Sequence, residues 1–179
     1  MMTALSVTRE TERGTMESLL ATPAQPIEVM VGKLAPYVMV GLMQTAVILI
    51  MAAILFRVPM EGGWIALGLG VLMFITGSLA LGFLISTFAR TQLQAMQMSF
   101  FYMLPSILLS GFMFPFRGMP DWAQAIGAAI PVTHFLRVVR GALLKGEGLA
   151  TLWPSHAALG VFVCVVTALA MLRYRRTLD

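Results

Sequence analysis

Charge is the property that this sequence has least of. Only 11% of its 179 residues are Asp, Glu, Lys or Arg, whereas 59% are hydrophobic; an average soluble domain has about 25% charged residues. These proportions argue against a water-soluble globular domain. The formal net charge is +4, but uncharged stretches separate the charges too widely for a nucleic-acid-binding surface, so we expect no nucleic-acid partner.

Cysteine and catalytic motifs are scarce as well. Cys164 has no second cysteine and no clustered histidines near it, which argues against a disulfide and against a metal site. The sequence has no Gly-x-x-x-x-Gly-Lys-[Ser/Thr] loop, no Gly-x-Ser-x-Gly elbow and no His-Glu-x-x-His motif. His134 and His156 are isolated, which is more typical of caps or interfacial groups than of catalysts. We therefore expect no catalytic residue, no metal site and no cofactor bound by this chain.

Long uncharged runs dominate the rest of the sequence. A membrane-spanning helix needs about 20 apolar residues, and four runs predict spans at about residues 34–56, 63–87, 93–114 and 153–172. Because lipid offers no partner to backbone N–H and C=O groups, each run should be a helix. The prediction is an all-α membrane protein with about four transmembrane helices, residues 34–179 forming the membrane domain.

The basic residues indicate an orientation. Four spans place both termini on one side, and seven basic residues fall on that side against five on the other. The positive-inside rule therefore favours cytoplasmic termini. The first seven residues lack the basic and apolar regions of a signal peptide, so we interpret them as the end of something longer.

Residues 1–33 form a polar segment, expected to be a cytoplasmic loop, before the first span. Thr15 predicts the N-cap of a short helix over Met16–Ala21, with Glu17 close to its positive N-terminus. Leu19 and Leu20 lie on this helix beside charged residues. They could pack on their own membrane domain or bind a partner, and the residues alone favour neither.

A second short helix is predicted from Pro26 to Lys33. Proline suits a helix start because its missing N–H would have no partner there. The same reasoning places Pro36 near the first turn of the first span. The short helix and the span are therefore expected to be separate elements.

A helical hairpin is predicted before the last span, at about residues 119–145. Prolines and glycines at positions 115–120 forbid one continuous helix. Asp121 is expected to cap a short apolar helix that ends at Ile130, and Thr133 to cap a second helix.

This second helix is amphipathic. One face carries Phe135, Leu136, Val138, Val139, Ala142 and Leu143, and the other carries His134, Arg137, Arg140 and Lys145. The pattern is typical of a helix at a membrane interface or in a re-entrant hairpin, with its arginines reaching water or headgroups. The alternative is a helix packed on the spans with its arginines in water.

Charged residues are absent from the predicted spans, which argues against a proton-driven or sodium-driven carrier. The polar residues chosen as candidates for a substrate pathway are Gln44, Gln97, Ser106 and Ser110. Residues of this kind more often pack helices together than contact a substrate.

Two motifs resemble the type-2 ABC exporter permease family. The first is Arg9–Pro23 (RETERGTMESLLATP), followed by Glu28 and by Gly32–Tyr37 (GKLAPY). The second is Phe114–Pro120 (FPFRGMP) with Trp122, then Ile130–Leu136 (IPVTHFL), Arg140-Gly141 and Leu144–Gly146. Their order and spacing extend the resemblance over essentially the whole chain.

The resemblance implies roles for both motifs. In the family, the loop carries a coupling helix that docks on a separate ATP-binding subunit, and the second motif forms an extracytoplasmic hairpin at the exit. Coupling would fall to Arg13, Thr15, Glu17, Leu19 and Leu20. The exit hairpin would use Pro115, Arg117, Pro120, Trp122, Pro131, His134, Arg137 and Arg140.

The resemblance further implies the permease subunit of an ATP-driven exporter in the bacterial inner membrane. Its partners would be an ATP-binding subunit that holds ATP and Mg²⁺, a second permease copy in a homodimer or heterodimer, and membrane lipids. Uncharged spans favour an apolar or amphipathic substrate, such as a drug or a lipid-like molecule. Such permeases have six spans, and this chain resembles the part from the end of the second onward. The alternative is therefore a non-transporting scaffold or truncated fragment that pairs with a full-length subunit; a membrane-embedded enzyme is disfavoured.

Overall fold

The computed structural model describes residues 26–58 and 63–176, and the regular structure in these ranges is entirely helical. The elements are α3 (Pro26–Phe56), α4 (Trp64–Phe88), α5 (Gln92–Leu109), the 3₁₀ helix η1 (Phe116–Gly118), α6 (Asp121–Ala129), α7 (Pro131–Lys145) and α8 (Leu149–Arg176). The predicted all-α fold is confirmed.

Three of the described helices are long and apolar enough to cross a membrane. These are α4, the Leu34–Phe56 part of α3 and the Leu149–Arg173 part of α8; the bent pair α6–α7 raises the number to four if it counts as one span. Helix α5 does not qualify, although its sequence was predicted to be the third span. Three glutamines in its first two turns lower its hydropathy, and a turn separates it from the apolar residues that follow it.

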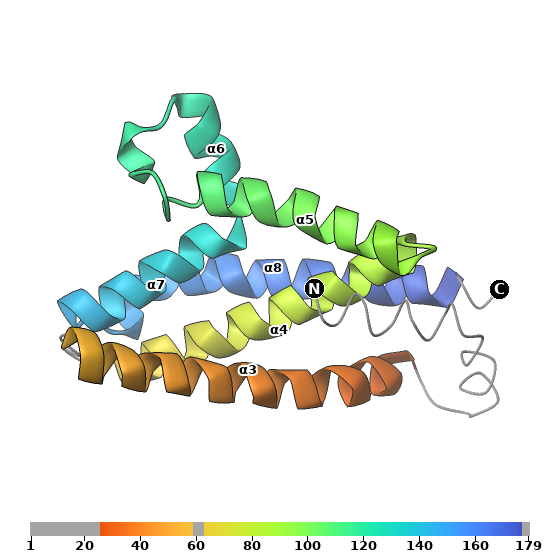
Figure 1. Cartoon of the computed structure of the whole chain (residues 1–179), viewed down its shortest axis with the longest axis horizontal. Helices are drawn as coiled ribbons and strands as arrows, with labels where there is room; N and C mark the ends of the chain where they lie inside the picture. The colour runs from red at the N-terminus through yellow and green to blue at the C-terminus, as the bar shows by residue number, and fades with distance from the viewer. Residues whose placement is uncertain (1–25, 59–62, 177–179) are drawn as a thin grey trace.

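Helix α4 occupies the centre of the bundle, where it contacts α3, α5, α7 and α8 (Figure 1). Its buried apolar residues form a core with residues of α7 and α8: Ala66, Leu67, Val71, Ala142, Leu143 and Leu152. Glycines bring the helices close. A Cβ atom added to Gly70 would lie 2.7 Å from Cγ1 of Val138, and one added to Gly77 would lie 2.8 Å from the Phe162 ring. Small residues of this kind are typical of helix contacts in membranes.

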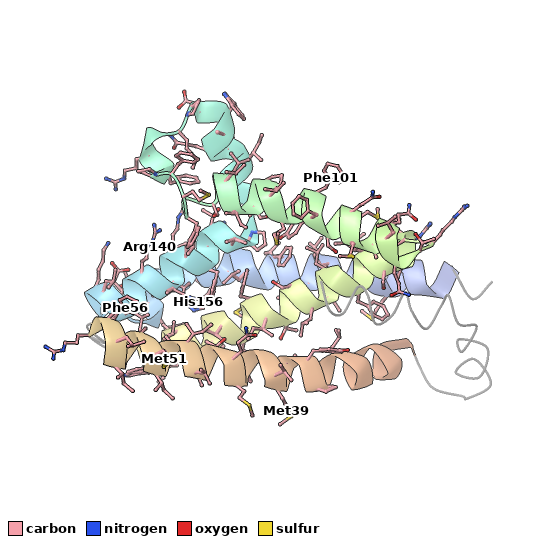
Figure 2. The ribbon with its side chains drawn as sticks, in the orientation of Figure 1. Met39, Met51, Phe56, Phe101, Arg140 and His156 are labelled. Atoms are coloured by element: carbon pink, nitrogen blue, oxygen red, sulfur yellow. The ribbon has the colours of Figure 1, made fainter. Side chains whose placement is uncertain are left out.

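Helix α3 packs on one side of the bundle and leaves an apolar face uncovered. Met39 is 72% exposed and Met51 47% exposed, and both side chains point away from the other helices in Figure 2. An uncharged segment such as Leu34–Phe56 with an open apolar face suits contact with lipid or with another membrane segment.

His156 of α8 is buried and connects α8 to α4 (Figure 2). Its Nε2 lies 2.8 Å from the carbonyl oxygen of Ala66 in α4. Its Nδ1 lies 2.9 Å from the carbonyl oxygen of Leu152, one turn earlier in α8. Hydrogen bonds between helices in an apolar environment contribute about 0.6–2 kcal/mol each. His156 is therefore a structural link between two spans and not a lone interfacial group.

We expect His156→Leu to lower the free energy of unfolding by about 1 kcal/mol, because the donor to the Ala66 carbonyl is lost. His156→Gln should retain most of the stability, since its amide can donate to the same oxygen. Thermal unfolding in detergent measures both. Equal unfolding temperatures for the wild type and the Leu variant would contradict this role.

The predicted break before the first span is wrong. Helix α3 runs without interruption from Pro26 to Phe56, and Pro36 lies inside it. Only the carbonyl four residues before the proline loses its N–H partner, and the remaining hydrogen bonds keep the helix intact. The predicted third span, residues 93–114, was also too long. Helix α5 ends at Leu109, and Gly111 turns the chain with a φ of 85°.

The two predicted helix caps in the hairpin are also wrong. Pro120 precedes α6, so Asp121 is the first residue of the helix. There its negative charge interacts favourably with the positive N-terminal end of the helix dipole. Helix α7 begins at Pro131 after Ile130. Thr133 therefore lies inside the first turn of α7, and its hydroxyl forms a bond to the preceding helix, described below.

The amphipathic pattern of α7 was predicted correctly, but its apolar face is covered by protein. Val138 and Ala142 are fully buried, and α7 contacts both α4 and α8. The ring of Phe135 stacks on Phe74 of α4 with 4.2 Å between centroids. The structure thus favours the alternative of a helix packed on the spans, with Arg137 and Arg140 exposed.

Candidate functional site

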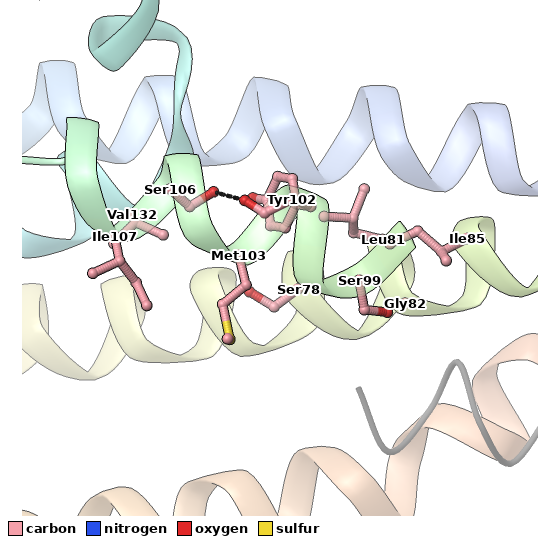
Figure 3. Close-up of a pocket in the computed structure, with 10 residues that line it drawn as sticks. All are labelled: Ser78, Leu81, Gly82, Ile85, Ser99, Tyr102, Met103, Ser106, Ile107 and Val132. Carbon is pink, nitrogen blue, oxygen red and sulfur yellow. Dashed lines mark hydrogen bonds between the residues drawn. The ribbon is translucent and has the colours of Figure 1, made fainter. Parts of the chain in front are cut away.

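A cavity of about 200 Å³ lies between α4 and α5, and Val132 of α7 also contributes to its lining. Figure 3 shows the residues that line it: Ser78, Leu81, Gly82, Ile85, Ser99, Tyr102, Met103, Ser106, Ile107 and Val132. The lining contains no Asp, Glu, Lys, Arg or His. Its polar groups are three serines and one tyrosine, so the cavity suits an apolar molecule with few hydrogen-bonding groups.

The polarity of this cavity is lowered further by hydrogen bonds within single helices. The Ser106 hydroxyl donates to the carbonyl oxygen of Tyr102 at 2.7 Å (Figure 3). Outside the cavity lining, Ser86 and Thr87 bond in the same way to carbonyls three residues earlier in α4. Serine and threonine commonly bond to their own helix backbone. The hydroxyl of Ser106 is therefore already engaged.

The four predicted pathway residues do not come together. Ser106 lines the cavity. Gln44 on α3 and Gln97 on α5 are exposed, outside the cavity lining. Ser110 is buried at the end of α5 and donates to the carbonyl oxygen of Ile107 at 3.2 Å.

The cavity residues that the pathway prediction omitted are Ser78, Ser99 and Tyr102. A signal for two of them was present in the sequence. Ser99 and Tyr102 precede Ser106 by seven and four residues, which places all three on one face of a helix. Ser78 and Gly82 form a small pair on the facing helix.

The segment predicted to form the exit hairpin contains a sharp bend between α6 and α7, whose axes differ by 84°. Two side chains of α7 hold the bend by bonding back to α6. The Thr133 hydroxyl donates to the carbonyl oxygen of Gly127 at 2.6 Å, and Nε2 of His134 lies 2.8 Å from the carbonyl oxygen of Ala128. The bend is thus stabilised locally, and Pro131 is buried at the start of α7.

Phe116, in the loop before α6, contacts both α6 and α7. Its ring carbon Cε2 would lie 2.8 Å from a Cβ atom added to Gly127 of α6. The guanidinium of Arg137 lies over the ring, 5.1 Å from the centroid, and Arg140 donates to the carbonyl oxygen of Gly111 at 3.1 Å. Cation–π and hydrogen-bond contacts therefore attach this loop to α7.

The remaining predicted hairpin residues lie at the surface. Pro115, Arg117, Pro120 and Trp122 are exposed, Trp122 by 65%. The five predicted coupling residues, Arg13, Thr15, Glu17, Leu19 and Leu20, lie outside the described residues.

Comparison with known proteins gives a consistent result. Residues 1–144 match the family described as ABC-2 type transporter. The probable multidrug ABC transporter permease YbhS of Escherichia coli K12 is 33% identical over 179 residues, which cover 99% of this chain and 48% of the relative. The probable multidrug ABC transporter permease YbhR of the same strain is 31% identical over 175 residues, with 98% and 48% covered.

A third relative is the inner membrane transport permease YhhJ of Escherichia coli K12, 31% identical over 178 residues, with 99% of this chain and 48% of the relative covered. The chain thus spans about half the length of the curated relatives that it matches. No solved structure matches the chain significantly.

Proposed function

The chain belongs to the ABC-2 type transporter family, and we propose that, as a permease subunit, it moves an apolar or amphipathic substrate out of the cytoplasm. A separate subunit would bind ATP and Mg²⁺ and drive the transport. Relatives that match nearly the whole of this chain are named as permeases, which supports a role in transport.

The substrate class is supported by the cavity between α4 and α5. No charged side chain lines it, and the Ser106 hydroxyl is bonded to its own helix. A strongly polar cargo would lose its hydration there and gain only a few hydroxyl groups as partners, which costs several kcal/mol. A drug-like or lipid-like molecule would lose little.

The arrangement of the helices supports a coupled mechanism. The start of α3 and the end of α8 lie at the same end of the bundle (Figure 1), as expected if both termini are cytoplasmic. The chain that precedes α3 carries the proposed coupling residues, and α3 packs on α4, which lines the cavity. Movement of that loop by an ATP-binding subunit would therefore reach the cavity through one helix contact. A second permease copy in the inner membrane would complete the path.

We expect Ser99→Leu to reduce substrate-stimulated ATP hydrolysis by the assembled transporter about tenfold or more, because the larger side chain fills part of the cavity. Ser99→Ala is the matched control, since it removes the hydroxyl and leaves the space. Drug-stimulated ATPase activity in proteoliposomes measures both variants. If Ser99→Leu retained full stimulation, the cavity would not be the substrate site; if only charged, strongly polar compounds were transported, the substrate class would be wrong.

A further inference from the structure

Three arginines gather at the loop that joins α5 to α6. Arg117 belongs to η1 within this loop, Arg137 lies over Phe116, and Arg140 bonds to Gly111. In the part of the chain that the structure describes, none of the three forms an ion pair; the pair recorded there joins Lys145 to Glu147. Among the described residues, the loop is thus a local concentration of positive charge without an ion-paired carboxylate, with Asp121 at the start of α6 as the nearest acidic residue along the chain.

An apolar hollow of about 410 Å³ opens beside the same loop. Its lining residues are Leu108, Leu109, Phe114, Pro115, Gly118, Met119, Pro120, Trp122 and Ala123. Arg117 thus lies in the chain between two groups of lining residues, Phe114-Pro115 before it and Gly118–Pro120 after it. Phe114 and Trp122 are more than half exposed at its edge, in the manner of aromatic residues at a membrane interface.

Positive charge and an apolar hollow at one loop are complementary to a ligand with both an anionic and an apolar part. We infer that this loop binds one anionic phospholipid, with the phosphate on Arg117 and an acyl chain in the hollow. Guanidinium groups bind phosphate through paired N–H donors. Arg137 and Arg140 hold the loop against α7 and add to the positive potential that attracts the headgroup.

This site is distinct from the cavity between α4 and α5, because the two share no lining residue. It also differs from ordinary lipid contact along α3, where exposed apolar side chains such as Met39 lie away from Arg140 (Figure 2). Binding of a resident lipid does not depend on transport, so the inference can be tested without an ATP-binding subunit.

The test uses the full chain in mild detergent with added phosphatidylglycerol or phosphatidylcholine, and native mass spectrometry counts the bound lipids. Two variants address the two halves of the site. Arg117→Gln removes the headgroup contact. Gly118→Leu places a side chain at the hollow, where an added Cβ atom meets nothing within 4 Å, so the backbone has no reason to shift.

Each variant has a matched control. Arg90→Gln removes an exposed arginine from the turn between α4 and α5. Gly68→Leu introduces the same side chain on α4, where an added Cβ atom also meets nothing within 4 Å. Unfolding temperatures in lipid-free detergent identify any variant that is misfolded.

We expect the wild type and both controls to retain one phosphatidylglycerol that Arg117→Gln and Gly118→Leu bind about tenfold more weakly. Phosphatidylglycerol bound elsewhere would persist in every variant. Equal retention by Arg117→Gln and Arg90→Gln would overturn the headgroup assignment, and so would equal binding of phosphatidylcholine. Unchanged binding to Gly118→Leu would overturn the assignment of the acyl chain to the hollow.

Discussion

Replacement of both Leu19 and Leu20 by aspartate is expected to release the ATP-binding subunit and leave the permease in the membrane. Under the proposed function, these leucines enter an apolar groove of that subunit. Two carboxylates cannot enter such a groove without a desolvation cost of several kcal/mol. A loss of about 3 kcal/mol would weaken the complex by more than about a hundredfold. The spans themselves are untouched, so insertion should be normal.

Co-purification of the ATP-binding subunit with the tagged permease measures this effect, and the membrane fraction of the permease measures insertion. Ser6→Asp with Thr8→Asp is the matched control, because it adds two carboxylates to the same polar segment outside the predicted coupling helix. Retention of the subunit by the Leu19→Asp, Leu20→Asp variant would remove the coupling assignment. Equal loss in the control would show that charge, and not the leucines, governs the contact.

Gly127→Ala is expected to destabilise the protein by about 1–3 kcal/mol. An alanine in an exposed helix is normally up to about 1 kcal/mol better than glycine, so the expected sign is reversed here. The reason is local: a Cβ atom at this position would overlap the carbonyl oxygen of Leu109 and would lie 2.8 Å from the Phe116 ring. The carbonyl belongs to the end of α5 and has little freedom to move.

Thermal unfolding in detergent measures this cost, and Gly68→Ala is the control. An added Cβ atom at Gly68 meets nothing within 4 Å, so this variant should be neutral or slightly more stable. If Gly127→Ala behaved like Gly68→Ala, α6 would not pack closely on the end of α5.

The helices of the membrane domain were predictable wherever charge marks their limits. Arg57 follows α3, and Arg90 follows the end of α4. The positions of these charged residues in the sequence were therefore enough to predict where both helices end. The end of α5 was not predictable in this way, because the uncharged run continues to Phe116. The turn there depends on the left-handed conformation of Gly111 and on the packing of Phe116 beside Gly127, contacts that a linear pattern does not contain.

The candidate site shows a similar division. Ser106 was identified because a polar residue in an apolar run is conspicuous. Ser78 and Ser99 were visible as polar residues, but their common cavity depends on how α4 is rotated against α5. The helix caps were mispredicted for another reason. Asp121 and Thr133 are good capping residues, but Pro120 occupies the N-cap position of α6 and Pro131 is the first residue of α7.

The unbroken course of α3 has a mechanical consequence. At 1.5 Å per residue, its 31 residues form a rod about 46 Å long. The rod has one compliant point: Pro36 cannot donate to the carbonyl of Gly32, so resistance to bending is lowest there. A push delivered to the start of α3 would be absorbed partly as rotation about this point and passed on as a tilt of the longer arm. The arm from Pro36 to Phe56 is about 30 Å long, so a tilt of about 5° would move its far end by roughly 2.6 Å. A displacement near the first turns is therefore passed on to Phe56.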